Sequence, residues 1–277
     1  MDIPEKHLSP SQVSNEVEEN RQEQTNNLQA SKLLKANFAL TLILFVVIGL
    51  GTYYAWGPIT QYRNTNPLID GYVQPRSISD LVDHVQKSTV SIYCEFGPKK
   101  EYDQGTGWAM DIQTERESEF PTALVTNYHV IKNCVNGEGR LFVAAFGGEE
   151  FPAIIDNWDK ENDLAIIATK VRIDALELSQ NSPNPGYWVM AIGTADGYEG
   201  SVAFGNVLNV TETEVLITAA ISSGNSGGPL VDNEGKVIGT NSWSATEEQY
   251  NGAKSLDVMC IGIMKCAGKT YWDYRSP

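Results

Sequence analysis

The 277-residue sequence has few of the residues that build metal sites and few that bind nucleic acids. It contains 20 Lys and Arg against 35 Asp and Glu, so it lacks the basic surface that phosphate binding requires. Its three histidines show no metal-ligand spacing, and its four cysteines form no Cys-x-x-Cys pair. Four cysteines are too few for a small disulfide-stapled scaffold, although they allow two bridges. We therefore expect no nucleic-acid partner, no metal site and no cofactor.

Charged residues are absent from residues 36–62, and most of this stretch is apolar. Residues 36–56 read ANFALTLILFVVIGLGTYYAW, which as a helix would be about 30 Å long and match the hydrocarbon core of a bilayer. Tyr53, Tyr54 and Trp56 lie at its end, as in an interfacial aromatic belt. We therefore expect a single transmembrane helix at residues 36–56. A cleaved signal peptide and a buried core helix are the alternatives.

The segment before this helix is polar and has few aliphatic residues. Residues 1–35 are predicted to form a disordered tail, with a short amphipathic helix near residues 16–24 as the alternative. Lys32 and Lys35 precede the apolar stretch, whereas only Arg63 follows it closely. This asymmetry predicts a single-pass protein of the cell membrane, with a cytoplasmic N-terminus and an exported C-terminal part.

The residue composition of the sequence changes after a Pro- and Asn-rich spacer at residues 57–78. A short helix at residues 79–87 opens a folded domain that extends over residues 79–277. Short β-branched and aromatic runs then recur in two sets of six, divided near residues 178–185. This pattern predicts an all-β fold of two six-stranded barrels. The expected strands are Val90–Phe96, Gly105–Ile112, Ala123–His129, Leu141–Phe146, Phe151–Asn157 and Leu164–Ala168, followed by Tyr187–Ile192, Ser201–Val210, Glu214–Ala220, Pro229–Val231, Val237–Trp243 and Asp257–Ile263.

The most specific motif is the run from Gly224 to Gly228, which satisfies the G-x-S-x-G pattern of several serine hydrolases. In an α/β-hydrolase the catalytic histidine follows the serine, but every histidine in this sequence precedes Ser226. A subtilisin-like order would need an aspartate before His129 and an α/β framework, which the predicted strands do not provide. The order His129, Asp163, Ser226 remains.

These three residues lie in segments that resemble the chymotrypsin-like (trypsin-like) serine proteases, and most closely their HtrA/Deg branch. The resemblance covers about residues 79–265 and implies a chymotrypsin-like double barrel that hydrolyses peptide bonds of proteins or peptides through an acyl-enzyme. The matching segments are GTGW at 105–108, VTNYHVI at 125–131, NDLAII at 162–167, WVMAIGTADG at 188–197 and ISSGNSGGPLVDNEGKVIGTNS at 221–242.

Each of these residue types has a chemical reason to be present. A serine hydroxyl is a weak nucleophile, so Ser226 needs a base, and His129 can take its proton and later protonate the leaving amine. Asp163 would accept the other ring N–H of His129 and fix its tautomer. The resemblance implies that the N–H groups of Gly224 and Ser226 form the oxyanion hole and that Ser242 supports Asp163.

Substrate preference is partly readable through the same resemblance. It places Ala219, Ala220 and Ile221 at the base of the S1 pocket, and since none of them is acidic, we expect cleavage after small or medium apolar residues. The resemblance also implies a strand edge that pairs with the extended substrate. The residues expected on that edge are Gly239, Thr240, Asn241 and Trp243.

The cysteines follow the apolar stretch, where disulfides can persist if that part is exported. Cys94 and Cys134 flank the first strands and the His129 loop, and a disulfide between them would add about 4 kcal/mol in the chain-entropy model. Cys260 and Cys266 can pair only if the chain reverses between them, so free thiols or another connectivity stay open.

Two departures from the family limit the regulation that we expect. Asn225 stands where many chymotrypsin relatives carry the aspartate that binds a new N-terminus, so activation by that ion pair is not expected. The residues after Ser226 are needed for the second barrel, so we expect no PDZ domain. The alternative function is a non-catalytic peptide-binding, sensor or chaperone-like module on the same fold. The natural substrate and the oligomeric state are not readable from the sequence.

Overall fold

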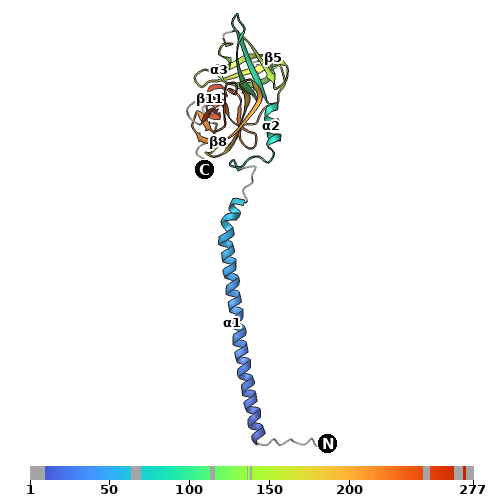
Figure 1. Cartoon of the computed structure of the whole chain (residues 1–277), viewed down its shortest axis with the longest axis vertical. Helices are drawn as coiled ribbons and strands as arrows, with labels where there is room; N and C mark the ends of the chain where they lie inside the picture. The colour runs from blue at the N-terminus through green and yellow to red at the C-terminus, as the bar shows by residue number, and fades with distance from the viewer. Residues whose placement is uncertain are drawn as a thin grey trace, which may run out of the picture. The chain divides into compact units, whose positions relative to one another are not determined.

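The computed structural model describes residues 10–63, 70–112, 116–135, 137, 139–245, 250–264 and 271–272. The chain divides into two units, one ending at Thr65 and the other beginning at Asn66 (Figure 1). The first unit contains one helix, and the second contains all the strands. The two units are described separately below.

The first unit is the single helix α1 (Pro10–Arg63). Within Glu18–Tyr53 it contains a window with a mean hydropathy of 2.3 whose side chains are all exposed, so it is long and apolar enough to cross a membrane. A signal sequence would pass the same test. The helix starts well inside the segment predicted to be disordered and ends inside the predicted spacer. The polar extension is helical because its Glu, Gln, Lys and Ala residues favour helix and can propagate it from the apolar segment without a new nucleus.

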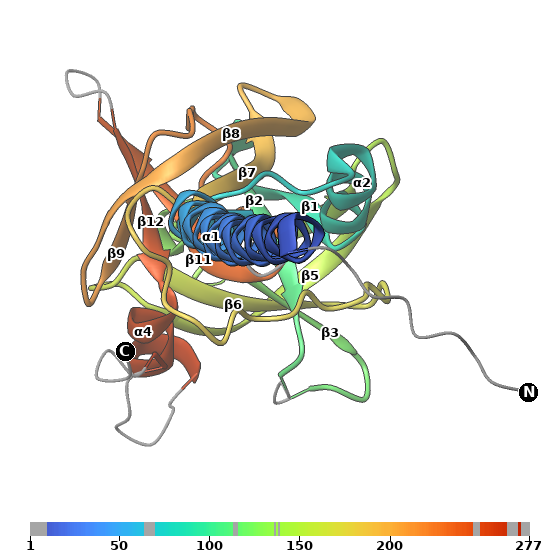
Figure 2. The ribbon, with the colours of Figure 1, turned by 90° about the horizontal axis from the view of Figure 1, so that it is seen from below.

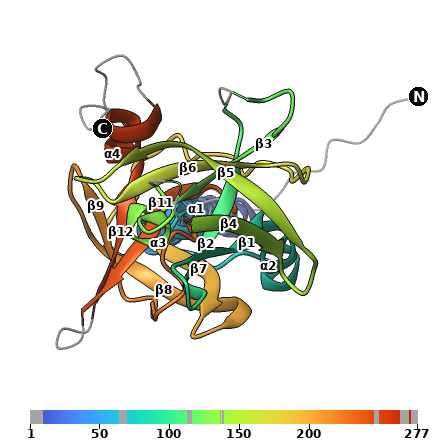
Figure 3. The same ribbon diagram turned by 90° about the horizontal axis from the view of Figure 1, so that it is seen from above.

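The second unit consists of two closed six-stranded barrels, as the sequence predicted. The first has the strand order β1-β2-β3-β6-β5-β4 and the second β10-β11-β12-β9-β8-β7, with every neighbouring pair antiparallel (Figures 2 and 3). The helix α2 (Ile78–Lys87) precedes them, and its first turn is capped by the Ser77 side chain. The strands are β1 (Thr89–Phe96), β2 (Glu101–Met110), β3 (Thr122–Thr126), β4 (Gly139–Ala145), β5 (Glu150–Asp159), β6 (Leu164–Thr169), β7 (Trp188–Ala195), β8 (Tyr198–Val210), β9 (Glu214–Ile217), β10 (Pro229–Val231), β11 (Val237–Ser244) and β12 (Asn251–Ser255).

The barrels meet through a continuous apolar core. Trp108, Val125 and Leu164 of the first barrel are fully buried in the same cluster as the core residues of the second. The indole N–H of Trp108 also donates to Thr240 Oγ1 across the interface, at 3.2 Å. Because this interface is apolar and closely packed, it fixes how loops from the two barrels meet.

One predicted strand was wrong and another was wrong in part. The last strand was expected at Asp257–Ile263, but that segment forms the short helix α4 (Leu256–Met259) and a π-helical turn, η1 (Cys260–Met264). The last strand is β12, whose residues NGAKS have little β propensity and are held by pairing with β11 and β9. The strand expected at Ala123–His129 ends at Thr126 and is followed by the helical turn α3 (Tyr128–Ile131).

Residues 70–77 were predicted to be spacer, but they pack on the second barrel. Trp188 N–H donates to Gly71 O at 2.7 Å, and the ring of Tyr72 packs edge-on against that of Tyr187. The Asn233 side chain donates to the carbonyls of residues 70 and 73, at 2.9 and 2.7 Å. This segment therefore belongs to the folded unit.

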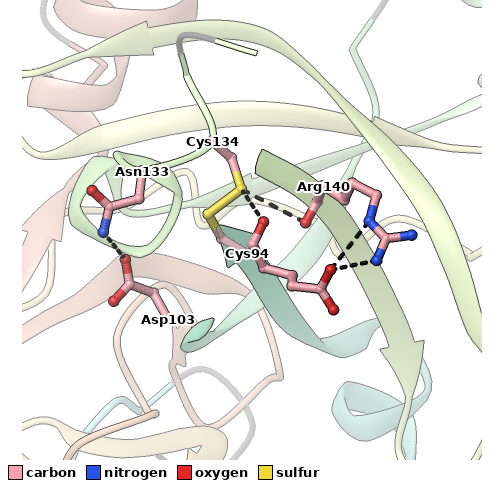
Figure 4. Close-up of a disulfide and its surroundings, with 6 residues drawn as sticks. Cys94, Asp103, Asn133, Cys134 and Arg140 are labelled. Atoms are coloured by element: carbon pink, nitrogen blue, oxygen red, sulfur yellow. Dashed lines mark hydrogen bonds and ion pairs between the residues drawn. A yellow bond between two sulfur atoms is a disulfide. The ribbon is translucent and has the colours of Figure 1, made fainter. Parts of the chain in front are cut away.

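A disulfide joins Cys94 of β1 to Cys134, which follows α3 (Figure 4). The predicted Cys94–Cys134 pair is thus confirmed, with its Cα atoms 5.9 Å apart. It ties the end of the turn that carries His129 to a central strand of the first barrel. Cys260 is disulfide-bonded too, whereas Cys266 lies outside the described residues.

Candidate active site

His129 and Asp163 come from neighbouring loops of the first barrel. His129 lies on α3, directly after β3, and Asp163 directly precedes β6, the partner of β3. Asp163 has a φ of 55°, in the left-handed region, and its carbonyl accepts a hydrogen bond from the Asn127 side chain at 2.7 Å. This backbone conformation is uncommon for a residue with a Cβ, although aspartate adopts it more readily than most, and the Asn127 hydrogen bond helps to hold it.

The Asp163 carboxylate is the centre of a hydrogen-bond network. His129 Nδ1 lies 2.8 Å from Oδ2, and the His129 backbone N–H donates to Oδ1 at 2.9 Å. The Ser242 hydroxyl, from the second barrel, donates to Oδ2 at 2.9 Å. Burial alone would raise the pKa of Asp163, but the hydrogen bonds and charge of His129, with the bond from Ser242, outweigh it and lower this pKa below its ordinary value.

Ser226 lies in the glycine-rich turn between β9 and β10. Its hydroxyl donates to the Ser242 carbonyl at 3.1 Å, and its own carbonyl accepts from Thr106 N–H at 2.8 Å. His129, Gly224 and Ser226 line one open cleft between the barrels. The three residues predicted from the sequence order therefore lie in and beside one site, together with Ser242.

The two N–H groups expected to form an oxyanion hole are free of protein acceptors. Among the described residues, neither the N–H of Gly224 nor that of Ser226 donates a hydrogen bond. Gly224 has a φ of 93°, and a Cβ at this position would lie 2.1 Å from the carbonyl oxygen of Thr194. The position therefore accepts only glycine.

The residues predicted for the S1 pocket differ in exposure. Ala219 and Ile221 are buried, whereas Ala220 is exposed. The side chain of Asn251, on β12, donates to the Ala219 carbonyl at 2.7 Å and so lies beside this segment. Sequence reasoning missed Asn251, because the strand that carries it has no β-like pattern.

The predicted substrate edge needs a correction. Gly239, Thr240 and Asn241 are hydrogen-bonded on both sides, to β12 and to β10 with the adjoining turn, so they offer no open edge. The side chain of Thr240 points into the core, where it accepts the hydrogen bond of Trp108. In the described part of β11, Trp243 and Ser244 pair with β12 on one side and with no described strand on the other, and Ser242 lies at a register shift just before them.

Several polar residues of the cleft were given no role by the sequence reasoning. Tyr102, Asp103 and Gln104 of β2 and Lys132 after α3 lie outside the matching segments, whereas Asp196 of the β7–β8 turn and Ser223 of the Ser226 loop lie within them. Among the residues that the structure describes, no group of three or more His, Cys, Asp or Glu side chains is arranged to hold a metal ion.

Comparison with known proteins agrees with the fold. Residues 105–239 match the family model of the trypsin-like peptidase domain, a segment that contains His129, Asp163 and Ser226. A solved structure of the serine endoprotease from Yersinia pestis matches with a TM-score of 0.59 and 23% identity, covering 69% of this chain and 66% of the other.

Two curated proteins show the same relationship in sequence. A probable periplasmic serine endoprotease of DegP type from Chlamydia pneumoniae is 34% identical over 137 residues, which are 43% of this chain and 26% of that protein. Serine protease HTRA3 of Mus musculus is 31% identical over 186 residues, which are 59% of this chain and 39% of that protein. The chain thus spans only about a quarter to two fifths of these relatives. Its double barrel has the chymotrypsin-like fold, and its residues 105–239 are similar to the trypsin-like peptidase domain and to segments of the HtrA/DegP serine endoproteases.

Proposed function

We propose that this chain is a membrane-anchored serine endopeptidase with His129, Asp163 and Ser226 as its catalytic triad. The observation that carries the proposal is the Asp163 carboxylate, which holds His129 Nδ1 at 2.8 Å in the cleft that Ser226 also lines. The family-model match and the names of the relatives support the same activity.

The geometry supports a distinct role for each group. Because His129 Nδ1 faces a carboxylate with a lowered pKa, Nδ1 carries the proton and Nε2 is free to accept one. The Ser226 hydroxyl turns from the Ser242 carbonyl to His129 Nε2, gives up its proton and attacks the peptide carbonyl carbon. His129 then donates that proton to the leaving amine. Water next attacks the acyl carbon while His129 accepts its proton, and His129 returns the proton to the Ser226 oxygen as the acyl-enzyme bond breaks.

The developing negative charge needs donors that are already in place. The N–H groups of Gly224 and Ser226 serve this role, since both are unpaired and belong to the loop that carries the nucleophile. Loss of one such donor typically costs about 3 kcal/mol of transition-state stabilisation. No metal or cofactor takes part in these steps.

The substrate is proposed to be a protein or peptide cleaved after a small or medium apolar residue. Ala220 and Ile221 support this preference because neither carries a charge that could pair with a basic or acidic side chain. The extended substrate pairs with residues 242–244, where β11 has an open side.

Membrane anchoring is the second part of the proposal. The apolar residues 36–56 of α1 span the bilayer once, with the N-terminus in the cytoplasm and the protease domain on the outer side. The disulfides of the second unit fit an oxidising compartment, and the relative from Chlamydia pneumoniae is named periplasmic.

A non-catalytic peptide-binding role is the competing function, favoured by the hydrogen bond of the Ser226 hydroxyl to a backbone carbonyl. The test is a peptide library incubated with the detergent-solubilised full chain and read by mass spectrometry. We expect cleavage after small apolar residues, lost in Ser226→Ala and kept in Ser222→Ala. Peptides that bind but are not cut, or cleavage that survives in Ser226→Ala, would contradict the enzyme.

A further inference from the structure

Thr106 of β2 joins the first barrel to the nucleophile loop of the second. It is fully buried, at 0% exposure. Its N–H donates to the Ser226 carbonyl at 2.8 Å, and its hydroxyl donates to the Gly224 carbonyl at 2.7 Å. The same hydroxyl accepts a hydrogen bond from Thr194 N–H of β7 at 3.0 Å. One side chain therefore contacts both the loop and the strand on which the loop packs.

The peptide group before Gly224 is held by one hydrogen bond and the peptide group after it by two, because the Asn225 N–H also donates to the Ser222 carbonyl at 3.1 Å. The carbonyl of Ser223 accepts from Asp196 N–H at 2.6 Å, and the carbonyl of Gly224 accepts from Thr106 Oγ1. Glycine rotates more freely than any other residue, and Gly224 has a positive φ. Without these bonds the Ser223–Gly224 peptide could turn its N–H away from the cleft.

We propose that Thr106 is a positioning residue whose hydroxyl keeps the Gly224 N–H directed at the reacting carbonyl. This inference rests on the proposed function, because it concerns the oxyanion hole of that reaction. Thr106 touches no substrate and acts only through Gly224. The N–H group is useful as an oxyanion donor because its direction is set before the reaction begins.

The position of Thr106 also couples the oxyanion hole to the alignment of the barrels. The hydroxyl belongs to the first barrel, whereas Gly224 and Thr194 belong to the second. The Thr106 methyl group also packs close to Gly228, since a Cβ at Gly228 would lie 3.1 Å from it. A shift of one barrel against the other would break the hydroxyl bonds and release Gly224.

The test compares Thr106→Val, which keeps the shape and removes the hydroxyl, with Thr106→Ser, which keeps the hydroxyl. Thr89→Val is the matched control, because Thr89 is also buried and its hydroxyl bonds to the Val85 carbonyl at 2.7 Å, away from the loop. The detergent-solubilised full chain and its variants are assayed for kcat, KM and the Kd of a peptide boronate that mimics the tetrahedral intermediate.

We expect Thr106→Val to lower kcat at least tenfold and to raise the Kd of the peptide boronate by a similar factor. Its KM should stay within about twofold of the value for the unmodified chain. Thr106→Ser should retain at least a third of kcat, and Thr89→Val should retain kcat while losing stability. If Thr106→Val does not fold, Thr106→Ala removes the same hydroxyl and is measured in its place.

A kcat of Thr106→Val within twofold of the original would overturn the inference, as would an equal loss in Thr89→Val or no rescue by Thr106→Ser. Each of these outcomes is measured against an unmodified chain that cleaves peptides, so none of them contradicts the proposed function. An original chain that cleaves none overturns the proposed function and this inference together.

Discussion

The two barrels have the same strand order but contribute different parts of the candidate site. The first barrel supplies side chains that carry or exchange charge, namely His129, on a turn that a disulfide ties to β1, and Asp163, on the loop before β6. The second supplies the Ser226 hydroxyl and two unpaired backbone N–H groups. The proposed proton chemistry therefore depends on hydrogen bonds between side chains, whereas the proposed oxyanion donors belong to a backbone loop that Thr106 and close packing on β7 hold in place.

The glycines of the second barrel show how the loop that carries Ser226 is held in place. A Cβ on Gly228 would lie 2.1 Å from the Ile192 carbonyl oxygen, and one on Gly193 would lie 2.5 Å from Asn225 Oδ1. The loop thus lies directly on β7, where no side chain fits. The Ser242 hydroxyl of the second barrel donates to Asp163 of the first, and the Thr106 hydroxyl of the first barrel donates to Gly224 of the second. The site is therefore complete only when the two barrels are aligned.

The largest effect should follow from removing the proton acceptor of the first barrel. We expect His129→Ala to lower kcat by about 10⁴-fold or more, as Ser226→Ala does, and the double variant to lose little more, because the two groups act as one unit. Steady-state hydrolysis of a peptide found in the library measures this. Additive losses in the double variant would show that the barrels do not share one reaction.

Removing the disulfide should affect stability and the first barrel's part of the site. The double variant Cys94→Ser, Cys134→Ser should lose about 2–5 kcal/mol of unfolding free energy and lower kcat through the turn that carries His129. Denaturant unfolding and kinetics check both effects. Unchanged stability would mean that the buried bridge is no constraint on the first barrel.

The second barrel should depend instead on the segment that precedes α2. Asn233→Ala removes two hydrogen bonds to residues 70–73 and should cost about 2 kcal/mol, without changing kcat. Asn209→Ala, at an exposed position of β8, is the control. Thermal unfolding measures the difference, and equal stability of the two variants would place the segment outside the folded unit.

The smallest effect concerns the bond that Ser242 makes to Asp163. Ser242→Ala should raise the pKa of Asp163 and cost about 1.5 kcal/mol at pH 7. Because the folded-state pKa is lowered, this stability is present above the unfolded value near 4 and is lost as the pH falls through the folded value. Unfolding from pH 7 to pH 2 should show the two proteins converging in acid, and a constant difference would contradict this.

The sequence was sufficient for the parts that local motifs encode. Recurring short β-branched and aromatic runs predicted two barrels, which the structure contains. The order of His129, Asp163 and Ser226, with the family resemblance of the segments around them, predicted a single site, and the structure brings His129 and Asp163 together. The disulfide followed from the positions of Cys94 and Cys134 beside the same loop.

The rest depends on contacts between distant residues. The strand β12 forms because two neighbours pair with it, so its sequence carries no strand signal. The open part of β11 depends on where β10 stops pairing, so the pairing of Gly239 and Thr240 with β10 could not be read from their own sequence. The bond from Thr106 to Gly224 joins residues 118 positions apart, so no local pattern could predict it.

The central claim is that Ser226 is a nucleophile activated by His129 and Asp163. A fluorophosphonate reacts only with an activated serine, so the adduct can be located by peptide mass spectrometry of the labelled full chain. We predict one adduct, on Ser226, that disappears in His129→Ala and in Ser226→Ala. A correctly folded chain that forms no adduct at pH 7–8, or one that still labels Ser226 without His129, would contradict the account.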